Sequence, residues 1–216
     1  MTLLQTNVFH PLSVAEHEFL QLIDVFDNDG KKTIELHPYS SLTYLIVGWA
    51  IDIDISVITT WTDCTCTIFW LFVSDAKRPV TGSLKVSLNH SHTSADIELI
   101  SFLYDGAKIA IDGSIDIWTH LDQVHGHLLE HNIVLGKQIS LKTLPKLAVA
   151  SYNVTAAHGA KIDTIDQQKL FYMMSRGLSQ AQSQTLLVHG YIDAVLAHFG
   201  EISDKEKEHV RKILVQ

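Results

Sequence analysis

The chain has 216 residues, of which 46% are hydrophobic and 19% charged, so it can bury a sizeable core and is not an intrinsically disordered chain. Sixteen basic and 24 acidic residues give a net charge of −8, which argues against nucleic acid as a partner. The excess of acidic residues lies within 1–160, whereas 161–216 holds seven residues of each sign. This difference indicates two parts in a chain of about one domain's length.

The N-terminal region has no basic residue before Lys31, and we therefore expect no secretory or transit peptide. The longest apolar stretches fall far short of the roughly 20 residues that span a bilayer. Only two cysteines occur, Cys64 and Cys66, which is too few for a disulfide-stabilised scaffold. We expect a cytoplasmic protein that does not enter a membrane.

Residues 1–32 are predicted to form an N-terminal segment with one short helix. The helix is expected over 14–25, with Ser13 as its N-cap and Glu16 at the third helical position, the arrangement of a capping box.

Residues 33–160 are predicted to form a β core, because short segments with β-type patterning follow one another there. The segment 51–57 alternates apolar and polar residues, whereas 65–73 is nearly continuously apolar, as expected for a strand covered on both faces. The spacing suits a sandwich, a barrel or a solenoid. The predicted strands are 51–57, 65–73, 84–88, 97–100, 108–111, 114–118, 132–135, 138–141 and 147–150, with Asp112-Gly113 among the turns.

Residues 161–216 are predicted to form a three-helix domain, because the apolar period changes there from 2 to 3.6. Asp166, Ser179 and Ser203 are the expected N-caps, the last two each with Gln or Glu three positions later. In the second helix the expected inward positions are Leu187, Tyr191, Val195 and Phe199, followed by a stop at Gly200.

A group of histidines suggests one enzymatic alternative. His90 and His92 would lie on one face of a strand, which is a geometry of metal ligands in a cupin-like β-barrel. However, Gly82 lies eight residues before His90, and Glu98 six residues after His92, and neither spacing matches the cupin pattern. A histidine-rich β-barrel metal-dependent enzyme remains the alternative hypothesis.

The two cysteines would also share one face of a strand, where a thiolate pair could carry sulfur or iron. Because free cysteine is among the most buried residue types and the flanking strand is very apolar, we interpret Cys64 and Cys66 as core residues. The sequence has no glycine-rich phosphate loop, no Gly-x-Ser-x-Gly and no Cys-x-x-Cys, so it gives little support for catalysis.

The run from His158 to Leu178 closely resembles the C-terminal signature of the SufB/SufD family. That signature reads His-Gly-Ala, a short gap, Asp, then Leu-Phe-Tyr-x-x-Ser-Arg-Gly and a helix. The similarity extends over about 84–199 and includes the Pro145-containing step before the signature. On spacing alone, His158 would be a capping or hydrogen-bonding histidine where the strands give way to helices.

The resemblance implies a right-handed parallel β-helix, or solenoid, followed by a small helical domain. It also implies a noncatalytic scaffold subunit of the Suf machinery that builds iron–sulfur clusters. Such a subunit pairs with a SufB-like chain, or here with a second copy of itself, and docks a SufC-like ABC ATPase through its helices. The further alternative is a solenoid interaction protein that has lost the family role.

The SufD-like branch fits this chain better than the SufB branch. SufB chains carry His-Glu-Ala and a nearby cluster-ligating cysteine, whereas this chain has His158-Gly159-Ala160 and its nearest cysteine is Cys66. In that branch the resemblance places His158 and Gly159 at the subunit interface, where the histidine receives iron or helps to assemble a transient cluster. No permanently bound cofactor is expected.

Other roles also follow from the resemblance or from residue type. Tyr191 and Phe199 are aromatic residues of the kind that interfaces favour, and we expect them to dock the ATPase. Structural roles are expected for five residues of the signature, with Arg176 at a helix end: Phe171, Tyr172, Ser175, Arg176 and Gly177.

Overall fold

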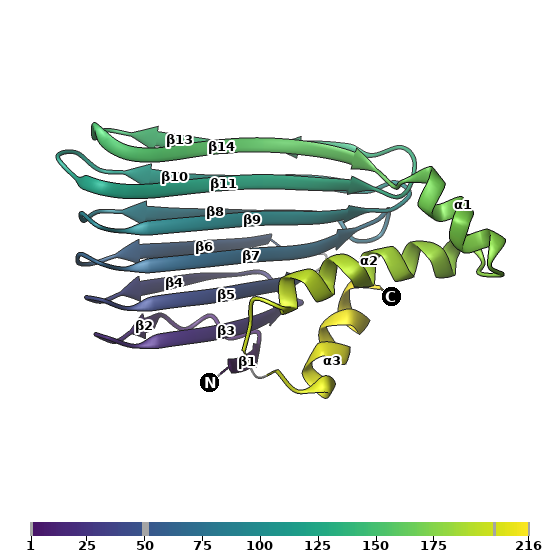
Figure 1. Cartoon of the computed structure of the whole chain (residues 1–216), viewed down its shortest axis with the longest axis horizontal. Helices are drawn as coiled ribbons and strands as arrows, with labels where there is room; N and C mark the ends of the chain where they lie inside the picture. Colours follow the sequence, from purple (N-terminus) through teal and green to yellow (C-terminus); the bar gives the residue numbers. More distant parts are fainter. Residues whose placement is uncertain (1, 49–51, 201, 216) are drawn as a thin grey trace.

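The computed structural model describes residues 2–48, 52–200 and 202–215. Strands occupy most of the chain up to residue 164, and three helices follow (Figure 1). The strands are β1 (Thr2–Thr6), β2 (Leu12–Val14), β3 (Phe19–Phe26), β4 (Gly30–Leu36), β5 (Ser41–Gly48), β6 (Asp52–Thr59), β7 (Thr65–Ser74), β8 (Val80–Leu88), β9 (Ser94–Leu103), β10 (Lys108–Ile117), β11 (Asp122–Val134), β12 (Ser140–Thr143), β13 (Lys146–Val149) and β14 (Asn153–Thr164). The helices are α1 (Gln167–Ser175), α2 (Gln180–Leu196) and α3 (Asp204–Leu214).

Successive strands alternate between two sheets. The first sheet has the order β1-β3-β5-β7-β9-β11-β14, and the second has the order β12-β10-β8-β6-β4-β2, with β13 also pairing with β10. The neighbouring strands of both sheets run parallel. Each coil therefore contributes one strand to each sheet, and the coils stack as Figure 1 shows. The predicted parallel β-helix is confirmed.

The space between the sheets is filled by rows of side chains from equivalent positions of successive coils. Ile46 of β5 pairs in register with Trp70 of β7, which pairs with Leu99 of β9, and all three are almost fully buried. Because a shift of one residue would turn a whole strand inside out, these rows fix the register. Stacking buries apolar faces that a single coil could not bury alone.

One corner of the solenoid is built from residues with left-handed backbone. His17, Tyr39, Asp63, His92 and His120 have φ values between 56° and 60° and connect strands of the second sheet to strands of the first. Histidine and aspartate are among the residues that tolerate this region best, which explains part of the histidine content of the chain. Several of the histidines are therefore corner residues.

The last coil is interrupted in the second sheet. β12 pairs with β10 up to Thr143 opposite Ile111, and β13 resumes in the same register with Lys146 opposite Ser114. Pro145 lies in the gap, opposite Gly113 by that register. Proline has no amide proton to donate to a ladder, so the strand is divided there.

The helices cover the outer face of the first sheet. α2 and α3 contribute a buried apolar cluster together with outward side chains of β3, β5, β7, β9 and β11. This cover explains why 65–73 reads as continuously apolar, and the prediction of a strand buried on both faces is confirmed. None of the described helices is long and apolar enough to cross a membrane.

The predicted N-terminal helix is wrong. Residues 12–14 and 19–26 form β2 and β3, and the turn between them passes through His17 with a φ of 58°. The side chain that bonds back to a backbone amide is Glu18, whose carboxylate accepts from the Ala15 N–H at 2.8 Å. Pairing of β3 with β1 and β5 buries Phe26 and its neighbours, and this tertiary gain overrides the local capping signal.

The strands of the core are longer than predicted. Asp112-Gly113 is not a turn but lies within β10, where Gly113 faces the interior and a Cβ would meet Leu99 at 3.0 Å. The strand predicted over 132–135 is the end of β11. β14 continues to Thr164, so the solenoid extends past the predicted boundary at residue 160. Strands of the solenoid also occur within 2–32, where a separate N-terminal segment was expected. The predicted strand start at Ile51 lies outside the described residues.

The helix caps are confirmed. Asp166 accepts hydrogen bonds from the backbone of Gln168 and Lys169, and Ser179 and Ser203 both form complete capping boxes. The apolar stripe of α2 is shifted by about one residue from its expected position at two places, because Val188 and Ile192 are buried where Leu187 and Tyr191 were expected. Val195 and Phe199 point inward as predicted.

Candidate functional site

His158 lies within a strand, not at the junction of strands and helices. It belongs to β14, which runs on for six residues to Thr164 before α1 begins at Gln167. A role in capping that junction is therefore wrong.

His158 points inward from the last coil of the solenoid. It pairs in register with Leu128 of β11, whose side chain is fully buried in the core between the sheets, so both face the interior. No further strand covers β14 within the described residues, and His158 stays exposed. Its Nδ1 atom lies 3.0 Å from the Pro145 carbonyl oxygen, in the gap between β12 and β13. Because a carbonyl only accepts, this contact places the proton of the neutral imidazole on Nδ1 and leaves the lone pair on Nε2.

Gly159 faces the outer side of the same strand. A Cβ atom at this position would meet only the Cδ1 atom of Leu129, at an ordinary 3.9 Å. Packing within this chain therefore does not require glycine here. The close approach of a partner or a cluster that was expected at Gly159 remains a prediction.

The end coil exposes several large apolar side chains around His158. Leu144 and Val149 from the second sheet are 54% and 43% exposed, and Ile162 on β14 is 64% exposed. β14 also has a free edge, since within the described residues it pairs only with β11. An apolar end with unpaired backbone groups is a surface on which another chain can dock.

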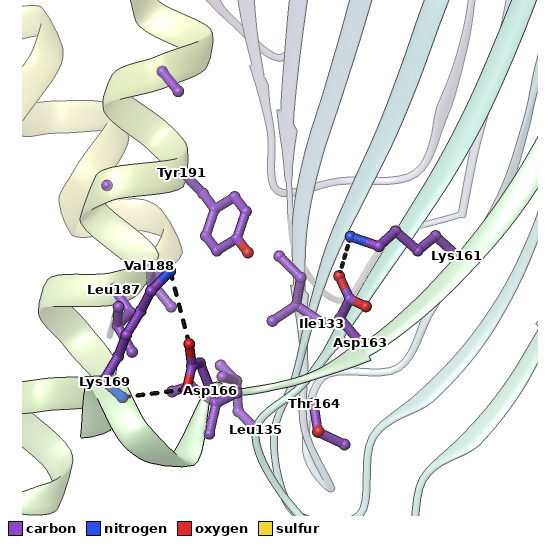
Figure 2. A pocket seen from close by; sticks show the side chains of 13 residues that line it. Ile133, Leu135, Lys161, Asp163, Thr164, Asp166, Lys169, Leu187, Val188 and Tyr191 are labelled. Carbon is purple, nitrogen blue, oxygen red and sulfur yellow. Dashed lines mark hydrogen bonds and ion pairs between the residues drawn. The ribbon is translucent and has the colours of Figure 1, made fainter. Parts of the chain in front are cut away.

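A groove of about 550 Å³ lies between the first sheet and the helices, away from the interior of the solenoid (Figure 2). Lys161 forms an ion pair with Asp163, and this lysine is the main reason why the pKa of the Asp163 carboxyl is lowered. The Nε2 atom of His131 lies 2.9 Å from the same carboxylate, and its ring contacts Tyr191 edge to face. These contacts tie α2 to the end of the sheet and leave the charges of the groove paired.

The signature residues of α1 lie on the surface. Phe171 and Tyr172 are 74% and 59% exposed, so they add nothing to the packing of this chain's core. Arg176 is the C-cap of α1 and places its guanidinium 5.3 Å from the centre of the Tyr172 ring. Ser175 donates a hydrogen bond to the Tyr172 carbonyl, and Gly177 follows with a φ of 96°. The N–H groups of Gly177 and Leu178 donate to the carbonyls of Met174 and Met173, so α1 ends in a Schellman motif.

The two residues expected to dock an ATPase lie against the sheet. Phe199 is 5% exposed and packs on the outer face near Phe69, so its use as a free docking residue is wrong. Tyr191 is 37% exposed, and its ring contacts Phe102 as well as His131. Tyr191 thus fixes α2 to the solenoid, and Phe199 fixes the segment that follows α2. The other exposed large apolar residues of the helices are Phe171, Tyr172, Met174 and Leu186, and each is more exposed than Tyr191.

The cupin-like alternative is wrong. The strands form parallel coils, not the antiparallel barrel that a cupin requires. His90 stacks on Trp61 in the corner of the solenoid, and His92 is one of the corner residues with positive φ. Among the described residues there is no group of three or more His, Cys, Asp or Glu side chains placed to hold a metal ion.

The cysteines are core residues, as predicted. Cys64 and Cys66 are 0% and 2% exposed and belong to the apolar cluster between the sheets. Burial raises the pKa of the Cys66 thiol to about 12, so it stays protonated near neutral pH. Neither thiol is presented as a cluster ligand in this structure.

Glu130 is a buried residue near this site for which the sequence predicts no role. This residue lies on the inner face of β11, two positions after Leu128, and only 1% of its surface is exposed. The signal was present as a carboxylate at an even-numbered position in the alternating series Val124, Gly126, Leu128. The inward orientation of Glu130 follows from this alternation only if β11 extends over Asp122–Val134.

Comparison with known proteins finds similarity over the part of the chain that contains Glu130 and His158. A family model described as "SUF system FeS cluster assembly, SufBD core domain" matches residues 39–191. The iron–sulfur cluster assembly protein SufD of Escherichia coli is 28% identical over 87 residues, which are 40% of this chain and 21% of that protein. SufB of Bacillus subtilis is 24% identical over 102 residues, which are 47% of this chain and 22% of that protein. A SufBD family protein of Synechocystis is 25% identical over 111 residues, 51% of this chain and 24% of that protein. The matches thus span about a quarter or less of these relatives' length.

Proposed function

The chain belongs to the SufB/SufD family of iron–sulfur cluster assembly proteins, and on that basis we propose that it is a noncatalytic, SufD-like subunit of a Suf assembly complex. The observation that carries the proposal is the position of His158. It sits on the open end of the solenoid with Nδ1 fixed on the Pro145 carbonyl, and its Nε2 lone pair is free to meet iron or a cluster.

The SufD-like assignment is supported by what surrounds His158. Thiolates are the usual cluster ligands, and both cysteines of this chain are buried in its core. A thiolate at the site would therefore come from another chain. The cluster or iron is cargo that passes through the interface, and the protein holds no permanent cofactor in this proposal.

The partner chain would pair on the end coil. The free edge of β14 and the exposed side chains of Leu144, Val149 and Ile162 form a surface that another solenoid end could cover. The partner is a SufB-like chain, or a second copy of this chain with the same end. Assembly would take place in the cytoplasm.

The helices would dock a SufC-like ABC ATPase. The surface that supports this role consists of Phe171, Tyr172, Met174 and Leu186, which we call the α1–α2 patch. Three of its residues belong to α1 and Leu186 to the first half of α2, and α1 lies beyond the end of the sheet in Figure 1. Aromatic residues of this kind contribute strongly to protein interfaces.

Co-expression with a SufB-like chain and the ATPase, followed by co-purification, tests the proposal. We expect the three chains to elute together and the complex to develop iron–sulfur absorbance. The same experiment without the SufB-like chain distinguishes heterodimer from homodimer. If the chain elutes apart from both proteins and without a second copy, the proposed function is wrong.

A further inference from the structure

The inner face of the end coil brings a carboxylate close to His158. Leu128 is the register partner of His158, and Glu130 follows two residues later on the same inner face of β11. Strands lie about 4.8 Å apart and two residues rise about 6.6 Å, so these positions are about 8 Å apart, within reach of two long side chains. The register partner of Glu130 itself is Ala160, whose small side chain leaves room above the carboxylate.

Glu130 is a buried carboxylate that interacts with the Thr143 hydroxyl and the Gly113 N–H without reaching ordinary hydrogen-bond geometry. Its side chain is 1% exposed, and neither oxygen makes a hydrogen bond of ordinary geometry within the described residues. Burial raises the pKa of the Glu130 carboxyl, while the nearby Thr143 hydroxyl, Gly113 N–H and His158 oppose that rise, and Asp112 adds to it. A buried charge is expected to be paired or to bind a metal.

Asp24, another carboxylate in the same row of inward-facing side chains, has a cationic partner. Asp24 connects to Glu130 through the register partners Ile46, Trp70 and Leu99. The Asp24 Oδ2 atom lies 2.5 Å from Lys32 Nζ and accepts from the Tyr44 hydroxyl at 2.7 Å. Within the described residues, no lysine or arginine forms an ion pair with Glu130. The cationic partner of Asp24 thus has no counterpart beside Glu130 among the described residues.

The imidazole beside Glu130 is oriented as a metal ligand. Metal-binding histidines commonly donate their second ring N–H to a carbonyl or carboxylate, which fixes the ring and its tautomer. His158 donates from Nδ1 to the Pro145 carbonyl, in the gap where the ladder between β12 and β13 is broken. The gap lies opposite Gly113, whose amide is also near Glu130. His158 and Glu130 therefore both lie near this gap in the ladder, and His158 influences the Glu130 carboxyl electrostatically.

We propose that Glu130 and His158 together form a site for a divalent cation, with Glu130 as an acidic second donor to the iron that His158 receives. The inference rests on the proposed function and adds a residue to it. One carboxylate and one imidazole suit ferrous iron, and two donors leave coordination positions for water and for groups of the partner chain. The ion would supply the positive charge that Glu130 lacks.

Cobalt(II) is the probe for this site, because its visible spectrum reports ligation. The full-length chain is titrated with Co²⁺ as wild type, Glu130→Gln and His158→Ala, with Glu35→Gln and His127→Ala as matched exposed controls. We expect both site variants to weaken binding at least tenfold and both controls to bind as the wild type does. We also expect Glu130→Gln to raise the melting temperature of the ion-free chain and to abolish the further rise on adding Co²⁺, because it removes an unpaired buried charge.

The outcomes separate this inference from the proposed function. If His158→Ala loses Co²⁺ but Glu130→Gln binds it as tightly as the wild type, Glu130 is not a donor, and the role of His158 stands. If the wild-type chain binds no Co²⁺ above the background of the two site variants, the two-residue site is overturned. The co-purification and cluster absorbance of the complex would still test the proposed function independently.

Discussion

The Nζ atom of Lys32 lies 2.5 Å from the Oδ2 atom of Asp24 inside the solenoid, and both side chains are almost completely buried. Removing one partner of such a pair leaves an uncompensated charge in the core. We expect Lys32→Met to lower the free energy of unfolding by about 3–5 kcal/mol. The double variant Asp24→Leu/Lys32→Met should lose much less than the sum of the two single changes, as measured by urea denaturation. Strict additivity would contradict the pairing.

The pH dependence of Lys32→Met follows from the same carboxyl group. Burial raises the pKa of Asp24 above its usual value, so the folded state binds a proton more tightly than the unfolded state. The contribution of this carboxyl to the free energy of unfolding therefore increases as the pH falls through its folded-state pKa. The contribution decreases again as the pH rises through that pKa. The deficit of Lys32→Met should shrink when denaturation is repeated at mildly acidic pH.

His158→Ala separates a site residue from a structural one. The lost hydrogen bond to the Pro145 carbonyl should cost about 1 kcal/mol of stability. We expect the variant to fold and to join the complex, yet the complex should accumulate little or no iron–sulfur absorbance. His127→Ala, which removes an exposed imidazole from the outer face of β11, is the control and should leave the absorbance unchanged. Normal cluster yield from an assembled His158→Ala complex would contradict the proposal.

The α1–α2 patch should be the ATPase-docking surface. Because Phe171 and Tyr172 are exposed, replacing both with serine should leave the melting temperature nearly unchanged and weaken ATPase binding by tenfold or more. Trp118→Ser is the control, since this tryptophan is 60% exposed at a corner of the solenoid. Deleting 179–216 is a poor test, since α2 and α3 cover the outer face of the sheet. Undiminished ATPase binding by the double variant would place docking elsewhere.

Two glycines of the helical region should respond oppositely to alanine. Gly177 has a φ of 96°, where a Cβ is strained even though no atom lies within 4 Å, so Gly177→Ala should destabilise the chain by about 1 kcal/mol. Gly190 lies inside α2 with open space around it, so Gly190→Ala should stabilise the chain by about 0.5–1 kcal/mol. Thermal unfolding of the two variants checks both signs, and a shift in the same direction would refute this account.

The parts that the sequence predicted well depend on local chemistry. Asp166, Ser179 and Ser203 begin helices because their side chains satisfy backbone amides within three residues. The continuous apolar run at 65–73 predicted its burial on both faces in the same way. The choice of a solenoid over a sandwich or barrel came from the family signature, because strand spacing alone is compatible with all three.

The parts that it missed depend on pairing between coils. Residues 19–26 carry a strand whose partners, β1 and β5, are separate segments, while the nearby capping pattern is local and favours a helix. His158 was placed at a junction because nothing in its own neighbourhood shows that β14 pairs with the whole of β11. Glu130 was missed for the same reason, since its inward orientation follows from that register.

The cover of α2 and α3 over the first sheet changes how this solenoid should fold. Coils that touch only their neighbours can unzip one at a time. Here the helices contact the outer face from Ile23 of β3 to Ile133 of β11, and the Gly200 N–H donates to Gln21 Oε1 at 3.0 Å across 179 residues of sequence. We therefore expect the coils to melt as one cooperative unit. These contacts also mean that the chain reaches its most stable state only after its C-terminal helices have been synthesised.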